Sequence, residues 1–170
     1  MSRFTTSLAG FALSTLALSA AAAEPGSWQQ HDIQFRYMGF TSIYSCDGLA
    51  DRLKELLLYA GARADAKSRS AGCTELSGPD PMAGARLTFS TVAGDPKADA
   101  PAGMVWRKLR FANGTPRDLQ SGECELIEQF RDEVLKKAFT LRNLTSRTSC
   151  FPHQANQRFD ISFEVLVPAK

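Results

Sequence analysis

The chain has 170 residues, of which 44% are hydrophobic and 22% charged, and its formal net charge at pH 7 is +2. This length suits one domain with a sizeable hydrophobic core. A charge so close to zero argues against a protein dedicated to binding nucleic acid or a membrane surface, so we expect no nucleic-acid partner.

Residues 1–23 have the pattern of a Sec-type secretory signal. Arg3 supplies a positive charge, an apolar segment follows, and a run of alanines precedes the cleavage site expected between Ala23 and Glu24. The apolar segment is shorter than the roughly 20 residues that a membrane-spanning helix needs, although a retained anchor is the alternative. We therefore expect a periplasmic or secreted protein without stable membrane insertion, whose mature part is a single α+β domain over 24–170.

The first strand of the mature part is expected to be long and bent. Residues 32–46 are rich in β-branched and aromatic side chains, which alternate until Gly39 interrupts the pattern as a β-bulge would. These residues open a first unit, about 32–92. The remainder of this unit is expected to form a helix and two further strands, at 46–61, 64–70 and 87–92.

A linker and a second unit follow. Residues 93–103 are rich in glycine, proline, alanine and aspartate, and we place the boundary between the units there. The second unit, about 104–167, has the same order of elements. Its expected strand, helix and two final strands lie at 104–111, 122–140, 144–150 and 159–167.

Four cysteines mark the two units as copies of one repeat. The distance from the opening cysteine to a Ser-Arg-Ser or Ser-Arg-Thr triplet is 22 residues in both units, and a further cysteine follows each triplet. Leu53 lies opposite Arg131 and breaks the match, with Phe130 one position earlier to fill the space. Chance similarity between two ordinary amphipathic helices is the alternative to a repeat.

Cysteines in an exported protein favour disulfide bonds, because the compartments outside the cytoplasm are oxidising. Four cysteines permit three pairings, and the sequence alone does not select one. The repeat favours Cys46 with Cys73 and Cys124 with Cys150, because each pair then closes one unit. The first pair would flank a helical crossover between parallel strands.

The order β-α-β-β, occurring twice, predicts an α+β fold. We expect a two-layer sandwich made of one mostly antiparallel sheet, with both helices on one of its faces and the disulfides as staples.

The sequence has no recognised catalytic motif. It lacks a Cys-x-x-Cys pair, a Gly-rich phosphate loop, a nucleophile elbow and a zinc-protease helix, so we expect no cofactor and no metal. His153 can be combined with Ser149 and Asp160 into a triad, but a solvated loop histidine is the simpler interpretation. Glu123, Glu125 and Glu128 could be proposed as an acid/base pair, but they lie in or near the first turn of the second helix, where acidic residues are favoured.

The most concentrated basic and aromatic stretch runs from Trp106 to Phe111. As a strand it places Trp106, Lys108 and Arg110 on one face and Phe111 on the other, which we expect to meet the helices. Four cations from other strands are expected on the open face: Lys67, Arg69, Arg86 and Arg147. Such a face suits an anionic glycan, a lipid headgroup or an acidic partner such as another envelope protein, and an ordinary solvated sheet face is the alternative.

The segment Phe40-Thr-Ser-Ile-Tyr-Ser-Cys46-Asp-Gly-Leu49, followed by Leu-Leu-Leu-Tyr-Ala-Gly61-Ala, resembles a group of small exported proteobacterial proteins. The shared features are a Cys-Asp-Gly-Leu helix start, an amphipathic helix that ends in Gly-Ala, and a further cysteine. The resemblance implies an exported location, and no activity is carried over from it.

The sequence therefore favours an exported envelope protein with a non-enzymatic binding or structural role. The alternative is a small secreted hydrolase or enzyme inhibitor that acts through the long loops at 74–85 or 117–122, since long loops often carry function.

Overall fold

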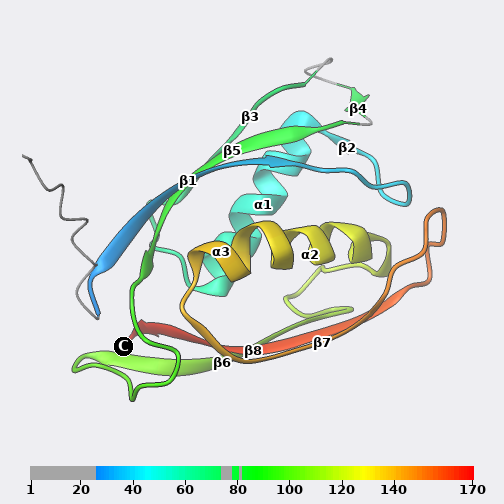
Figure 1. Cartoon of the computed structure of the whole chain (residues 1–170). Helices are drawn as coiled ribbons and strands as arrows, with labels where there is room; N and C mark the ends of the chain where they lie inside the picture. Colours follow the sequence, from blue (N-terminus) through cyan, green and yellow to red (C-terminus); the bar gives the residue numbers. More distant parts are fainter. Residues whose placement is uncertain (1–25, 74–77, 81) are drawn as a thin grey trace, which may run out of the picture.

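The computed structural model describes residues 26–73, 78–80 and 82–170. The described chain has an α+β fold in which two three-stranded antiparallel sheets enclose the helices (Figure 1). The elements of the first unit are β1 (Trp28–Arg36), β2 (Tyr44–Ser45), α1 (Cys46–Ala60), β3 (Lys67–Ser70), β4 (Pro79–Asp80) and β5 (Gly84–Val92).

The second unit repeats this layout without the counterpart of the short β2–β4 ribbon. Its elements are β6 (Met104–Ala112), a 3-10 turn (Ser121–Glu123), α2 (Cys124–Phe130), a π-helical turn (Arg131–Leu135), α3 (Lys136–Ala138), β7 (Leu141–Ser149) and β8 (Arg158–Pro168). The segments from α2 to α3 are continuous and form the second helix.

The two three-stranded sheets have the same topology. Their strand orders are β1-β5-β3 and β6-β8-β7, so the last strand of each unit lies between the other two and runs antiparallel to both. The two strands that flank each helix are therefore parallel in direction, as expected from a helical crossover, but a third strand separates them.

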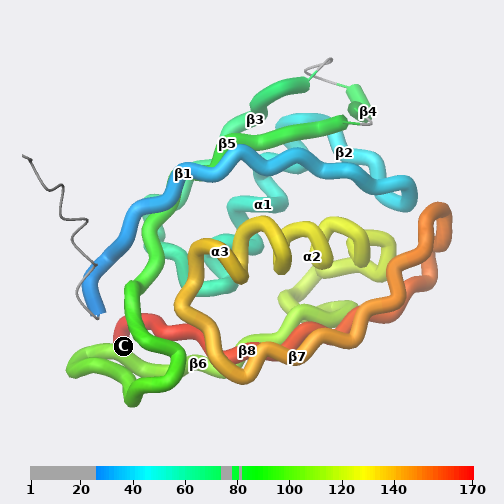
Figure 2. Tube along the Cα trace, viewed as in Figure 1, coloured from blue at the N-terminus to red at the C-terminus, as the bar shows by residue number. Residues whose placement is uncertain are grey.

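The expectation of one sheet with both helices on a single face is wrong. The two sheets lie on opposite sides of the helices, which form a middle layer (Figure 2). Each final strand enters the centre of its own unit's sheet, so each unit completes a sheet by itself. The alternation of apolar residues shows which face of a strand is buried, but it does not show which strands are neighbours.

The expectation of one long, bent first strand is also wrong. β1 begins earlier than predicted, at Trp28, and ends at Arg36, whereas Tyr44 and Ser45 pair with β4 in a separate ribbon. Gly39 lies in the turn between them. A Cβ atom on Gly39 would lie 1.8 Å from the hydroxyl oxygen of Tyr37, so only glycine fits above this buried ring.

The boundaries of α1 follow from its capping residues. The Ser45 side chain accepts a hydrogen bond from the backbone of Gly48, which satisfies one of the free amides at the helix start. Gly61 ends the helix in the left-handed conformation, with φ of 104°, which suits glycine. A Cβ atom at this position would also approach the Val167 side chain to 2.7 Å.

The second helix packs against both sheets through phenylalanines. Phe130 meets Phe111 of β6 edge to face, with ring centroids 6.0 Å apart, and Phe139 stacks on Phe89 of β5 at 5.8 Å. Phe130 is fully buried while Arg131 is half-buried, so Phe130 fills the core position that Leu53 fills in α1. Burial of such rings dominates the energy of small cores.

The structure contains the two disulfides favoured by the repeat, Cys46–Cys73 and Cys124–Cys150. Each one joins the first residue of a helix to a cysteine one to three residues beyond the next strand of the three-stranded sheet. On the chain-entropy model, closing loops of this size contributes about 3–4 kcal/mol each. Disulfides are typical of proteins in oxidising compartments.

The secretory signal expected at residues 1–23 lies outside the described residues, as do Ala23 and Glu24. Within the described part of the chain, no helix has both the length and the hydropathy needed to cross a membrane.

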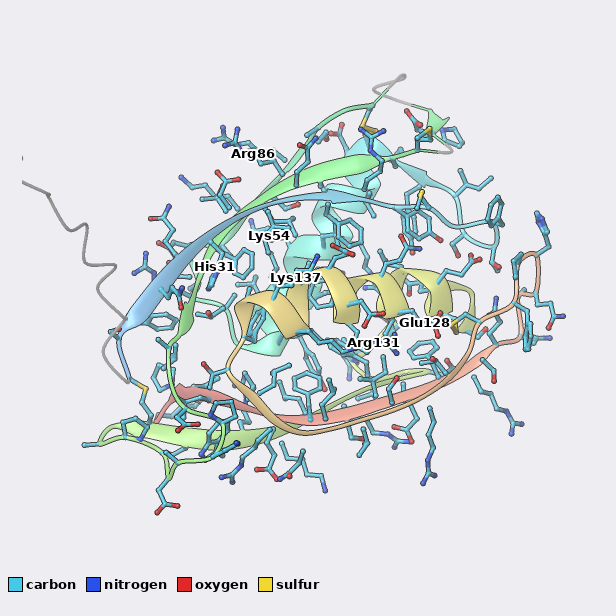
Figure 3. All side chains as sticks on the ribbon, in the orientation of Figure 1. His31, Lys54, Arg86, Glu128, Arg131 and Lys137 are labelled. Carbon is cyan, nitrogen blue, oxygen red and sulfur yellow. A yellow bond between two sulfur atoms is a disulfide. The ribbon has the colours of Figure 1, made fainter. Side chains whose placement is uncertain are left out.

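The ring of His31 lies on the inner side of β1 (Figure 3), where it bonds to Thr91 of β5, which in turn bonds to the end of the second helix. The Thr91 hydroxyl donates to the carbonyl of Ala138 at 2.5 Å, so the Nε2–H group of His31 donates to the Thr91 oxygen, 2.9 Å away. Burial lowers the pKa of His31 because it disfavours the charged imidazolium.

A lowered pKa means that the unfolded chain binds a proton on His31 more readily than the folded chain does. The free energy of unfolding should therefore fall as the pH drops below about 6.5, the ordinary pKa of histidine. Between pH 7.5 and 5.5, the free energy of unfolding measured in urea should fall more for the wild type than for His31→Gln, a variant that keeps a donor for Thr91. Equal losses in the two proteins would contradict this assignment.

Candidate functional site

The residues expected to form the site lie on the outer face of the β6–β8–β7 sheet. Trp106, Lys108 and Arg110 are opposite Leu166, Glu164 and Ser162 of β8. Phe111, the next residue along β6, is fully buried against the helices. The alternation of β6 therefore directs the trio away from the helix layer.

Trp106 is already covered by groups of the same chain. The guanidinium of Arg142 lies 4.4 Å from the centre of the Trp106 ring, and its Nε atom donates to Glu164 at 2.6 Å. This hydrogen bond is the main reason that the pKa of Glu164 is lowered. Gly94 of the linker lies against Leu166, where a Cβ atom would come within 2.5 Å. Arg142 thus covers part of the Trp106 ring, which is half-buried.

Arg110 is paired in the same sheet. Its Nε and Nη2 atoms donate to the two carboxylate oxygens of Asp160 at 2.8 and 2.9 Å, which lowers the pKa of Asp160. A depression of about 430 Å³ beside this pair is lined by Arg147 and Arg158 as well. The outer face of this sheet is therefore basic but partly neutralised by its own carboxylates.

The expectation that Lys67, Arg69 and Arg86 share a face with Trp106 is wrong. Their strands, β3 and β5, belong to the other sheet, so these three side chains lie on the opposite side of the molecule. Figure 3 shows Arg86 on the outer side of that sheet, away from the helices. Of the four expected cations, only Arg147 joins the Trp106 face.

The outer face of the β1–β5–β3 sheet holds two arginines side by side, Arg69 and Arg86, which we name the arginine pair. They occupy directly opposite positions on β3 and β5, and both are exposed. Arg86 binds Asp32 through Nε and Nη2, at 2.9 and 2.8 Å. Arg69 has no ion-pair partner among the described residues. A depression of about 420 Å³ is lined by Asp32, Lys67, Arg69, Ser70, Ala71, Arg86 and Thr88.

The second unit provides an internal comparison for the arginine pair. Arg69 and Arg147 are the central residues of the matching Ser-Arg-Ser and Ser-Arg-Thr triplets. Opposite Arg147 stands Asp160, whereas opposite Arg69 stands Arg86. Opposite charges in such a cross-strand position are favourable, and like charges are destabilising. Stability of the sheet therefore explains the pair in the second unit but not the pair in the first.

A polar cluster between the units contains residues that sequence reasoning assigned to helix starts. Glu123 is 8% exposed and accepts hydrogen bonds from Arg52 at 2.6 Å, from the Tyr44 hydroxyl at 3.1 Å and from the Gln120 amide at 2.8 Å. Burial and the Glu123 carboxylate raise the pKa of Tyr44. With both carboxylate oxygens bonded, Glu123 acts as a structural anchor.

Glu125 has a similar bridging role. One of its carboxylate oxygens accepts from the backbone amides of Phe40 and Thr41, each at 2.9 Å. One turn later, the amide side chain of Gln129 bonds both the N–H and the carbonyl of Met38. The second helix thus holds the loop that follows β1, and both glutamates make hydrogen bonds that tie separate segments of the fold together.

The arrangement of His153, Ser149 and Asp160 does not form a triad. Asp160 is bound by Arg110, and the exposed ring of His153 packs against Phe40, with centroids 5.7 Å apart. No hydrogen bond joins the three side chains within the described ranges.

The one group of three potential metal ligands among the residues with described positions is Cys46, Cys73 and Asp80. Both sulfur atoms are in the disulfide, so no thiolate is available to bind a metal ion there.

Comparisons of the chain with protein-family models, with curated proteins and with solved structures found no match. A function is therefore inferred from the geometry of the chain itself.

Removal of Arg52 should leave the buried carboxylate of Glu123 without an opposite charge beside it. We expect Arg52→Ala to lower the free energy of unfolding by about 3–5 kcal/mol, as is usual when one partner of a buried ion pair is lost. Lys54→Ala, an exposed position on the same helix, is the control and should change it by less than about 0.5 kcal/mol. If both substitutions change the free energy of unfolding equally, the Arg52–Glu123 ion pair makes no particular contribution to stability.

Proposed function

We propose that this protein is a non-enzymatic binding module that recognises an anionic group through the arginine pair. The observation that carries the proposal is the direct opposition of Arg69 and Arg86 on an exposed sheet face, where the matching position of the second unit has an arginine opposite an aspartate. An anion placed between the two guanidinium groups would remove their repulsion.

The chemistry of the pair suits carboxylate, sulfate and phosphate groups. A guanidinium presents its N–H donors in a planar fork, which binds such oxygens through two parallel hydrogen bonds. Lys67 lines the same depression and adds a third positive charge, against the single carboxylate of Asp32.

An acidic segment of another envelope protein or an anionic glycan is the partner class that fits this site. Both carry repeated anionic groups that an open, shallow sheet face can reach. The two disulfides agree with a protein that works in an oxidising compartment, where such partners occur.

The Trp106 face is the second candidate site for the same function. Arg110, Arg147 and Arg158 surround one carboxylate, Asp160, in the depression on β6–β8–β7. Asp160 already occupies Arg110, and Arg142 already stacks on Trp106. An incoming anion would compete there with both of these interactions. At the arginine pair it would compete only with Asp32 for Arg86, because Arg69 has no ion-pair partner among the described residues.

Two matched double variants distinguish the two faces. We expect Arg69→Ser with Arg86→Ser to weaken binding of dextran sulfate or poly-L-glutamate roughly tenfold at low ionic strength, because two charge-assisted contacts are lost. The wild-type affinity should fall with added salt, since the contacts are exposed. Isothermal titration calorimetry measures both effects.

The control is Lys108→Ser with Arg110→Ser, which removes two cations from the opposite face. It should bind both polymers like the wild type. Loss of binding in this control and not in the first variant would move the site to the Trp106 face. Absence of any measurable binding by the wild type would overturn the proposal.

A further inference from the structure

Three of the four edges of the larger sheets are protected against pairing with another chain. β3 is only four residues long, and β7 is irregular between Arg142 and Thr145, with Asn143 at a φ of 53°. On β6, the carbonyl of Arg110 accepts a hydrogen bond from the Tyr59 hydroxyl at 3.0 Å. Short strands, bulges and covering side chains are the devices by which proteins block their sheet edges.

The fourth edge, β1, lacks these devices. It pairs with β5 without interruption from Trp28 to Arg36, contains no proline, and lies at the margin of the β1–β5–β3 sheet (Figure 1). The free edge ends at Met38, where the Gln129 amide bonds both backbone groups at 2.9 and 2.7 Å, as a partner strand would. No such bond reaches the outer side of β1 itself within the described chain.

Two backbone hydrogen bonds show which residues of β1 face outward. The amide of Tyr37 donates to Ala83, and the amide of Ala93 donates to the carbonyl of Ser27. Because hydrogen-bonded positions alternate along an antiparallel pair, the odd-numbered residues of β1 bond to β5. The backbone groups of Gln30, Asp32, Gln34 and Arg36 therefore point to the free edge.

We infer that β1 pairs antiparallel with β1 of a second copy of this chain, about a two-fold axis at Gln34. The β1–β5–β3 sheets of the two copies would then form one continuous six-stranded sheet. In this register Gln34 lies opposite Gln34 of the second copy, and the outward N–H and carbonyl groups of Asp32, Gln34 and Arg36 in each strand face those of the other. Such an isologous contact closes on itself and produces a dimer.

Charge complementarity selects this register and this occupant. Asp32 of each copy lies opposite Arg36 of the other, so the axis places a second arginine beside each Asp32, which already binds Arg86 of its own chain. An axis at Asp32 would place two carboxylates against each other. An axis at Ile33 would place Asp32 opposite Gln34 and Arg36 opposite Gln30, so Arg36 would gain no carboxylate partner. A strand that complements itself in charge and in hydrogen-bonding positions indicates a second copy as its partner.

Cysteine cross-linking tests the register directly. Directly opposite residues on neighbouring strands have Cβ atoms about 4.5–5.5 Å apart, close enough for a strained disulfide or a short bifunctional cross-linker. Gln34→Cys in the mature protein should give a covalent dimer on oxidation or with a short bis-maleimide. Gln30→Cys is the control on the same strand and face, and should not react with its own copy, because Met38 lies opposite it in this register.

Analytical ultracentrifugation provides the second measurement. Arg36→Asp should weaken self-association roughly tenfold, because both pairs of opposite charge become pairs of like charge. Lys97→Asp, which makes the same charge change in the exposed linker, should leave it unchanged. Equal cross-linking at Gln30 and Gln34 would overturn the inference, as would a wild type that stays monomeric at high concentration.

Discussion

The buried pair of Arg52 and Glu123 is the interaction on which the rest of the structure depends. Arg52 lies on α1 and Glu123 at the start of the second helix, so the pair joins the two units through their helices. A charge removed from water is tolerated only when its hydrogen-bonding capacity is filled, and Tyr44 and Gln120 fill what Arg52 leaves open. Two thin sheets, each with one apolar face, thereby share a single layer of helices.

A shared helix layer dictates where function can lie. Both sheets turn their apolar faces inward, so their polar residues form two outer faces on opposite sides of the molecule. On one face, Asp160 and Glu164 bind the neighbouring arginines. On the other, the arginine pair keeps an excess of positive charge and lies near an edge strand with free backbone groups. Recognition of an anion and self-association would therefore use the same sheet.

Local patterns in the sequence predicted the α+β class, the order of strands and helices in each unit, and the disulfide partners, because spacing and periodicity are local properties. They did not predict two sheets, since alternation in β6 or β8 is the same whichever strands lie beside them. Arg52 and Glu123 are 71 positions apart, and a glutamate at a helix start has a sufficient local explanation. The arginine pair was visible only as two separate basic residues, because their opposition depends on strand register.

Hydrogen–deuterium exchange under native conditions tests most directly whether the two units form one cooperative core. The slowest amides of β5 and β8, the central strands of the two sheets, should open with the same free energy, because loss of the shared helix layer unfolds both sheets together. A clearly lower opening free energy for one central strand than for the other would contradict this, and would show two units that unfold independently.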